Sequence, residues 1–268
     1  MPMSKPRGSE HTRPYVPPSV VEQIRERRRH ALNWLLLLTL ACQALFASMP
    51  WIDPWVSGIF GSAEQGFPIA QGTGFLIYRE FLNHLFTALG LLALFGVLLA
   101  AIGRKLFALP QQVWVFIVGV YLLGPAVLVN GILKANWGRA RPVHTVEFGG
   151  DRLFSPPFEI ASQCVSNCSF VSGEAAAATA FAISAFVLTR FLASRVWRNG
   201  LFGAALSFAV SGALLRVAFG RHFLSDVIFS ALFVSLIAVA LSFIFVRRKD
   251  RVTGDASRNG SPGLQRAG

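Results

Sequence analysis

The chain of 268 residues is 53% hydrophobic and only 14% charged, and its mean hydropathy is +0.52. These values exclude an ordinary soluble domain and are typical of a protein that crosses a membrane several times. The formal net charge of +12 would suit nucleic acid, but the basic residues are distributed as a membrane topology signal, so no nucleic-acid partner is expected.

Six apolar segments are each about as long as the 20 or so residues that a bilayer-spanning helix needs. Each is expected to be helical, because a bilayer offers the backbone no water to bond to and the alternation of a membrane barrel is absent. The expected fold class is therefore all-α, a polytopic membrane protein with six transmembrane helices. The segments are roughly residues 31–49, 83–103, 113–133, 175–193, 201–218 and 223–246.

These spans form one membrane domain, residues 31–248, between a basic tail, residues 1–30, and a polar tail, residues 249–268, that is expected to be disordered. Six spans place both tails on one side, and that side carries most of the 25 Lys and Arg residues. An excess of Lys and Arg marks the cytoplasmic face. Both termini are therefore expected in the cytoplasm, with the odd-numbered loops facing outward.

Two of the outward loops are long. Residues 50–82 carry aromatic side chains that suit a segment lying along the membrane interface. Residues 134–174 include Cys164 and Cys168, whose spacing allows a disulfide outside the cytoplasm, with two unpaired thiols as the alternative. No group of His and Cys residues has the spacing of a zinc site.

Ionisable residues gather where three spans meet the outward face, and charges at such depths are costly unless they serve a function. The stretches are "KANWGRARP" with Lys134 and Arg141, "FVSGEA" with Ser172, Gly173 and Glu174, and "RVAFGRHFLSD" with Arg216, His222 and Asp226.

Together the three stretches have the chemistry of an oxyanion site. Arginine offers planar, bidentate donors to phosphate, and the backbone N–H groups at a helix start, as at Gly173, point at an anion. His222 and Asp226 share one helix face, so that Asp226 can accept a bond from one ring nitrogen and leave the other as a nucleophile. Taken singly, each stretch also fits a structural role, as a snorkelling anchor, a helix start or a salt bridge.

At these residues the sequence resembles the type-2 phosphatidic acid phosphatase family, which shares its core with the vanadium-dependent haloperoxidases. The family pattern is Lys-x6-Arg-Pro, then Pro-Ser-Gly-His, then Ser-Arg-x5-His-x3-Asp. The first motif matches fully, while Val171 replaces the proline, Glu174 the histidine and Leu215 the last motif's serine. The resemblance covers about residues 113–246.

The resemblance implies a role for each matching residue. The phosphate would be attacked by His222, oriented by Asp226, to give a phosphohistidine that water then hydrolyses. No metal or other cofactor is implied, because the basic side chains neutralise the charge. The groups that would hold the phosphate oxygens are the side chains of Lys134, Arg141 and Arg216, the hydroxyl of Ser172 and the N–H of Gly173.

Glu174 stands where the family has the histidine that protonates the leaving oxygen. Glu174 would be the acid itself if partial burial kept it protonated, although the nearby cations oppose this. Alternatively, His144 takes over, or the leaving group needs little help, as in an anomeric sugar phosphate or a pyrophosphate. A purely structural alternative is that Glu174 is an acid in the first turn of the helix, where its charge interacts favourably with the helix dipole.

The expected substrate is a membrane lipid phosphate with its head group on the periplasmic side of the bilayer. Lipid A phosphate is preferred, because the long outward loops suit a sugar head group and the loop with Cys164 and Cys168 resembles family members assigned to lipid A phosphate removal. Undecaprenyl pyrophosphate, phosphatidylglycerol phosphate and phosphatidic acid are alternatives. A lipid phosphotransferase and a non-catalytic lipid-phosphate binder are the hypotheses from other classes.

Overall fold

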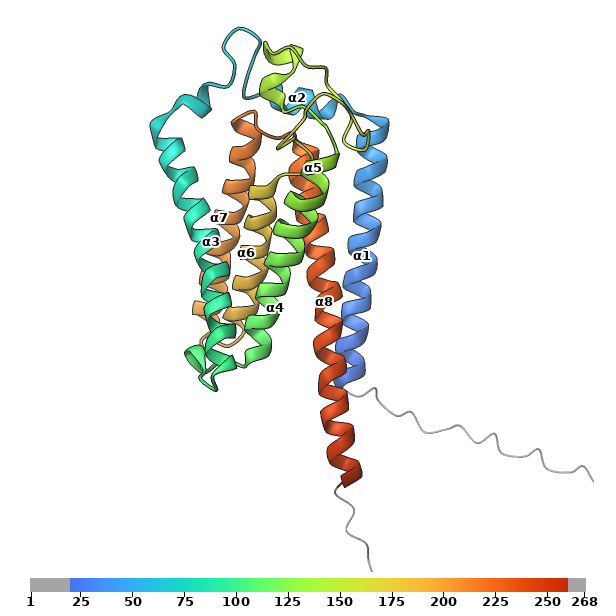
Figure 1. Ribbon diagram of the computed structural model, residues 1–268, viewed down its shortest axis with the longest axis vertical. Helices are drawn as coiled ribbons and strands as arrows, with labels where there is room; N and C mark the ends of the chain where they lie inside the picture. The colour runs from blue at the N-terminus through green and yellow to red at the C-terminus, as the bar shows by residue number, and fades with distance from the viewer. Residues whose placement is uncertain (1–19, 260–268) are drawn as a thin grey trace, which may run out of the picture.

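The structure is a computed structural model that describes residues 20–259, so most of the N-terminal tail and residues 260–268 lie outside it. The described chain is helical and contains no strand, only two isolated β-bridges, so the all-α expectation is confirmed. Its main helices stand side by side (Figure 1): α1 (Val20–Ser48), α3 (Thr73–Ala101), α4 (Gln111–Tyr121), α6 (Gly173–Thr189), α7 (Arg195–Ala218) and α8 (Leu224–Asn259).

Within the part of the chain that the structure describes, five helical segments are long and apolar enough to cross a membrane: Glu22–Ser48, Thr73–Ala101, Gln111–Asn136, Arg195–Ala218 and Leu224–Ile244. The remaining apolar helix, α6, has 17 residues and contacts α3, α4, α7 and α8. Its many buried alanines let these neighbours approach closely. The expected segment at residues 175–193 is thus a short helix packed within the bundle, and six crossings remain a proposal.

The third span changes its winding part-way. After α4 the chain continues as a π-helix, η3 (Leu122–Leu133), and ends in α5 (Lys134–Asn136). Pro125 has no N–H for the helical ladder, and its carbonyl accepts a bond of 2.8 Å from the side-chain amide of Asn130. Lys134 therefore lies at the end of a continuous membrane segment.

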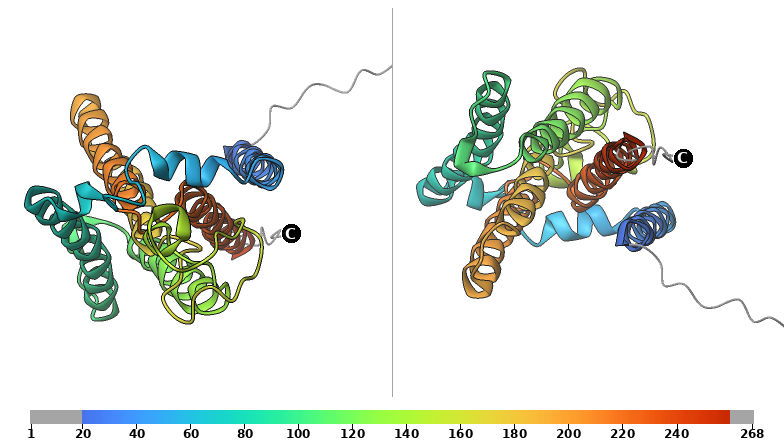
Figure 2. Two further views of the ribbon diagram at one scale, coloured as in Figure 1. Left: turned by 90° about the horizontal axis from the view of Figure 1, so that it is seen from above. Right: turned by 90° about the horizontal axis from the view of Figure 1, so that it is seen from below.

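Short elements cover the end of the bundle that lies away from the described termini. The helix α2 (Ile52–Gly58) lies across this end against α7 and α8, with η1 (Pro68–Gln71), η4 (Pro142–His144) and η5 (Val146–Phe148) in the surrounding loops. The turn η2 (Leu106–Ala108) joins α3 to α4 at the opposite end. Figure 2 shows α1 and α8 together on one side of the bundle and α3 on the other.

Two boundaries differ from expectation. The helix α3 begins at Thr73, so residues 73–82, expected in the first outward loop, are helical. The helix α8 continues to Asn259, so residues 249–259, expected to be disordered, are helical too. The first difference matters for the site, because it places Arg79 on a helix that faces α6.

Candidate active site

His222 lies in the tight turn between α7 and α8, where its side chain is buried. The carbonyl of Arg216 accepts the backbone N–H groups of both Arg221, at 3.0 Å, and His222, at 3.2 Å. Gly220 has a φ of +61°, which a residue with a Cβ rarely adopts. The five residues between Arg216 and His222 therefore close a compact turn that brings the imidazole back to the end of α7.

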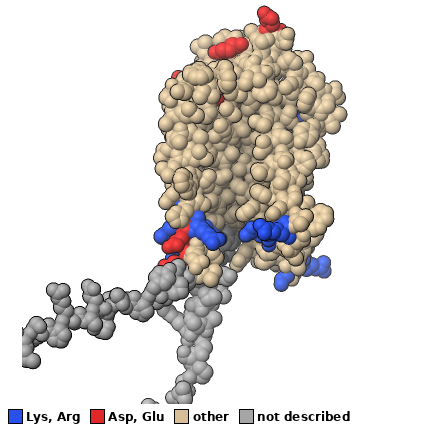
Figure 3. Space-filling view, turned by 180° about the vertical axis from the view of Figure 1, so that it is seen from behind, with Lys and Arg blue, Asp and Glu red and all other residues tan. Residues whose placement is uncertain are grey.

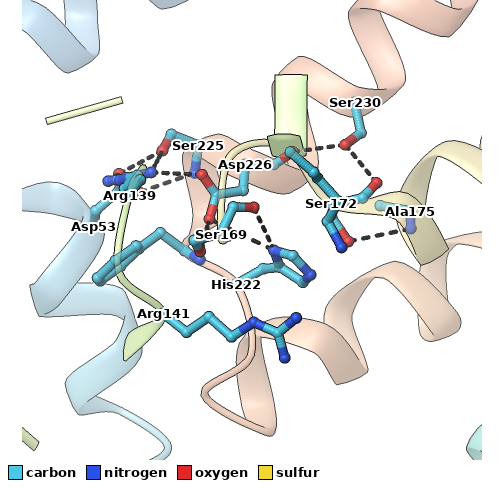
Figure 4. Close-up of polar contacts among 12 residues, drawn as sticks. Asp53, Arg139, Arg141, Ser169, Ser172, Ala175, His222, Ser225, Asp226 and Ser230 are labelled. Carbon is cyan, nitrogen blue, oxygen red and sulfur yellow. Dashed lines mark hydrogen bonds and ion pairs between the residues drawn. The ribbon is translucent and has the colours of Figure 1, made fainter. Parts of the chain in front are cut away.

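The His222 ring is held by the backbone rather than directly by Asp226. Its Nδ1 lies 2.7 Å from the carbonyl oxygen of Ser169 but 3.7 Å from Asp226 Oδ2 (Figure 4). Nδ1 therefore carries the proton that it donates to Ser169, which leaves Nε2 with a free lone pair. Burial lowers the pKa of His222 to about 4, so the ring is neutral near pH 7.

Asp226 acts on the histidine through Ser169. Its Oδ2 accepts the Ser169 hydroxyl at 2.5 Å and the N–H of Phe223 at 2.9 Å. Its Oδ1 accepts a bond of 2.6 Å from Arg139. The expectation of a direct bond to His222 is thus corrected, because Asp226 secures the loop whose carbonyl receives the histidine proton.

Behind Asp226 lies a fully buried network centred on Arg139. The Arg139 Nη1 donates to Ser225 Oγ at 2.9 Å as well as to Asp226, and Nη2 donates to Asp53 Oδ2 at 2.8 Å. Its Nε donates to the carbonyl of Ser155 at 2.8 Å. Asp53 also accepts the N–H and hydroxyl of Ser225. The network ties α2, the loop after α5 and the start of α8 together beneath the histidine.

The second motif forms the N-terminus of α6. Ser172 is the N-cap, and its Oγ accepts the N–H of Ala175 at 3.3 Å. Its own N–H donates to the carbonyl of Asp226, and its carbonyl accepts the Ser230 hydroxyl. The cap uses a lone pair of the Ser172 hydroxyl and not its proton, so this O–H and the N–H of Gly173 are suited to donate to an anion.

Gly173 also has a packing reason to be glycine. A Cβ at this position would lie 2.8 Å from Oδ1 of Asn130 in the third span. The absence of a side chain lets the start of α6 approach that span, close to the end that carries Lys134.

Two cations of the first motif meet at one loop residue. Lys134 Nζ donates to Asn167 Oδ1 at 3.0 Å, and Arg141 Nη2 donates to the Asn167 carbonyl at 2.8 Å. Asn167 lies in the turn that the disulfide between Cys164 and Cys168 closes. Each cation has further N–H donors for an anion, and Figure 4 shows the Arg141 guanidinium pointing toward His222.

Glu174 forms ion pairs with two arginines. Its Oε1 accepts Arg79 Nη2 at 2.5 Å, and its Oε2 accepts Arg79 Nε at 3.1 Å and lies 3.2 Å from Arg216 Nη1. Both oxygens are acceptors, which is the arrangement of an ionised carboxylate and not of a proton donor. Arg216 is buried, and its Nε has no hydrogen-bond partner among the described residues.

His144, the alternative acid, is exposed on η4, two residues beyond the first motif's Pro142. Partial burial and the nearby charges of Arg141 and Arg221 lower its pKa, so its ring is neutral near pH 7. No hydrogen bond joins its ring to the three motifs within the described range. Nor do the side chains that the structure describes include a group of three His, Cys, Asp or Glu residues placed to hold a metal ion.

Residues 113–251, about half of the chain, match the model of the PAP2 superfamily. The chain belongs to the PAP2 superfamily. The matched segment contains all three motifs, so the resemblance noted in the sequence is confirmed.

Three curated relatives of this PAP2 chain are each named Lipid A 4'-phosphatase. The protein of Francisella tularensis subsp. novicida is 32% identical over 206 residues, which are 76% of this chain and 91% of the relative. That of Rhizobium leguminosarum is 31% identical over 222 residues, 78% of this chain and 91% of the relative. That of Rhizobium etli is 45% identical over 109 residues, 41% of this chain and 40% of the relative. No solved structure matches the chain.

All eight motif residues that the PAP2 resemblance assigns lie at the loop-covered end of the bundle. The structure adds residues to which the motifs assign no role. Asp53 and Arg139 are two of them, and each had a signal in the sequence, a lone acid between tryptophans in "WIDPW" and an extra arginine inside the first motif. Arg79, Ser169 and Asn167 had no distinguishing signal.

Proposed function

We propose that this PAP2 protein is a membrane lipid phosphatase that removes a phosphate from lipid A through a phosphohistidine at His222. The observation that carries the proposal is the contact of His222 Nδ1 with the Ser169 carbonyl, which leaves a neutral nucleophilic Nε2 beside the N-terminus of α6. The names of the three relatives support lipid A as the substrate, with the 4'-phosphate as the group removed.

The reaction proceeds in two displacements. Nε2 of His222 attacks phosphorus, and the bond from phosphorus to the sugar oxygen breaks, so that this oxygen leaves with the electron pair and takes a proton from water. A second water then attacks phosphorus and gives a proton to the hydroxide that the first water left, the N–P bond breaks, and its electrons return to Nε2 as phosphate departs. One water is consumed overall, and the histidine is regenerated.

The basic groups of the site stabilise the charge that spreads over the phosphate oxygens in the transition state. Lys134, Arg141 and Arg216 supply positive charge that a metal supplies in other phosphoryl-transfer enzymes. Ser172 and Gly173 add donors that are fixed before the substrate binds, because both belong to the capped start of α6. Asp226 keeps the histidine oriented by way of Ser169.

We infer further that both termini lie in the cytoplasm of a bacterial inner membrane and that the site faces the periplasm. The start of α1 and the end of α8 lie at the same end of the bundle, as an even number of crossings requires (Figure 1). On the face seen in Figure 3, Lys and Arg gather at that end together with some acidic residues, other acidic residues lie at the opposite end, and the band between is almost free of both. This distribution supports the orientation by the positive-inside rule, with α6 as a short sixth crossing.

Phosphate release from a panel of lipids tests the proposed function. The purified protein in detergent micelles is given lipid A phosphorylated at the 4' or the 1 position, phosphatidic acid, phosphatidylglycerol phosphate or undecaprenyl pyrophosphate. We expect release from 4'-phosphorylated lipid A, and an acid-labile radiolabelled phosphoenzyme in the wild type. His222→Ala should abolish both, while the control His84→Ala changes an exposed histidine on α3 and should abolish neither.

Release from another lipid but not from lipid A would contradict the substrate. Full activity of His222→Ala would contradict the phosphohistidine. Label that appears on an acceptor lipid instead of in free phosphate would make the protein a phosphotransferase.

A further inference from the structure

Arg79 lies outside the three motifs, near the start of α3, yet its guanidinium reaches the second motif. It makes a two-point contact with Glu174, through Nη2 at 2.5 Å and Nε at 3.1 Å. The two side chains remain 31% and 25% exposed, so the pair lies at the open edge of the site rather than in the core. The contact links α3, which carries no motif residue, to the carboxylate of Glu174, the residue that replaces the family's histidine.

Glu174 holds two guanidinium groups and not one. Its Oε2 lies 3.2 Å from Arg216 Nη1, so α3, α6 and α7 each contribute one charged side chain to a trio. With Arg216 alone, Glu174 would cancel the positive charge that an anion needs. Arg79 restores one net positive charge to the trio. Arg216 is buried, and its Nε has no hydrogen-bond partner among the described residues, so its guanidinium keeps a donor that Glu174 does not use.

A purely structural role explains this arrangement less well. The pair is part-buried and two-pointed, so it contributes some stability, but α3 already packs on α6 and α7 through the buried side chains of Leu82 and Phe86. Arg79 is therefore not needed to fasten α3 to the bundle.

We propose that Arg79 belongs to the phosphate site, where Glu174 holds its guanidinium beside Arg216 so that it stabilises the charge on the phosphate and its leaving oxygen. The inference rests on the proposed function. Glu174 is then a positioning residue that transfers no proton. The electron pair of the broken P–O bond goes to the leaving oxygen, which Arg79 stabilises by a hydrogen bond until water protonates it.

The test compares Arg79→Ala, Arg79→Lys, Glu174→Gln and the double variant of Arg79→Ala with Glu174→Gln. The matched control is Arg152→Ala, because Arg152 is a half-exposed arginine that pairs with Asp151 and lies outside the site. Two quantities are measured: kcat and KM across pH on the lipid that the wild type hydrolyses, and binding of inorganic phosphate through its effect on thermal unfolding. The second needs no turnover, so it tests Arg79 even if lipid A is not the substrate.

We expect Arg79→Ala to lower kcat/KM about a hundredfold and Arg79→Lys to recover part of it, as for loss of one preorganised donor. Phosphate binding should weaken about tenfold in Arg79→Ala. Glu174→Gln should lose about tenfold alone but less than about threefold when Arg79 is already alanine, because the two residues act as a unit. Its pH profile should keep the shape of the wild type.

The inference is overturned if Arg79→Ala matches Arg152→Ala in both phosphate binding and kcat/KM. It is also overturned if Glu174→Gln removes one limb of the pH profile, because Glu174 would then be the proton donor. Additive losses in the double variant would show that Glu174 does not act through Arg79. If the wild type binds phosphate but hydrolyses no lipid, the proposed function is refuted. The role of Arg79 is then tested by the phosphate-binding measurement alone.

Discussion

Replacing Arg139 by methionine should lower the stability of the protein strongly, because it leaves two buried carboxylates without their cation. Arg139 is fully buried and contacts Asp226 at 2.6 Å and Asp53 at 2.8 Å. Removing one partner of a buried ion pair costs about 3–5 kcal/mol. Counting the two carboxylate bonds at about 1.5–3 kcal/mol each gives a similar range, about 3–6 kcal/mol.

The melting temperature in detergent micelles, followed by circular dichroism, measures this loss. For a chain of this length 1 kcal/mol corresponds to about 2–4 °C, so Arg139→Met should melt about 6–20 °C lower. Arg139→Lys keeps the charge but lacks the planar fork that reaches both carboxylates, so it should lose about half as much. Its kcat should still fall, because Asp226 then holds Ser169 and the histidine less firmly.

The matched control is Arg152→Met, which removes a half-exposed arginine that lies 3.3 Å from Asp151. An exposed pair contributes about 0–1 kcal/mol, so this variant should melt within about 4 °C of the wild type. If Arg139→Met melted no lower than Arg152→Met, the idea that the buried network holds the site together would be refuted.

Three further predictions concern the site. After correction for the ionisation of the substrate phosphate, kcat/KM should be retained at pH 5.5 and lost near pH 4, because the buried His222 becomes protonated only there. An acid limb of the profile near pH 6.5 would contradict this. Replacing Cys164 and Cys168 by serine should lower kcat/KM about tenfold, as the opened turn no longer holds the two first-motif cations; unchanged kinetics would show that the turn plays no part. Gly173→Ala should cost about 1–3 kcal/mol in unfolding measurements, because its Cβ meets Asn130 at 2.8 Å, and adding Asn130→Ala should restore much of the loss.

Several features of the site could be predicted because they depend on local spacing. Ser172 and Gly173 directly precede an apolar helical run, so the capped start of α6 follows from neighbouring residues. Arg216 and His222 are separated by one tight turn, which keeps them together whatever the rest of the fold does.

Other features could not be predicted, because the same short stretch of residues suits two different local structures. The residues of "GFLIYREF" suit both an interfacial loop and the first turns of a membrane helix, and only the packing of α3 against α6 and α7 decides for the helix. In the same way, the spacing of His222 and Asp226 allows a direct bond. The structure places the Ser169 carbonyl closer, since buried Phe170, stacked on Trp137, holds that loop in place.

The sequence by itself determined that the protein is a helical membrane protein and which short stretches carry its chemistry, because hydropathy and motif spacing are properties of neighbouring residues. Only the tertiary structure decided which partners those stretches receive. Arg79 meets Glu174 across 95 positions of the chain, and Asp53 meets Arg139 across 86. No local pattern encodes such contacts, since they exist only where helices far apart in sequence are packed together.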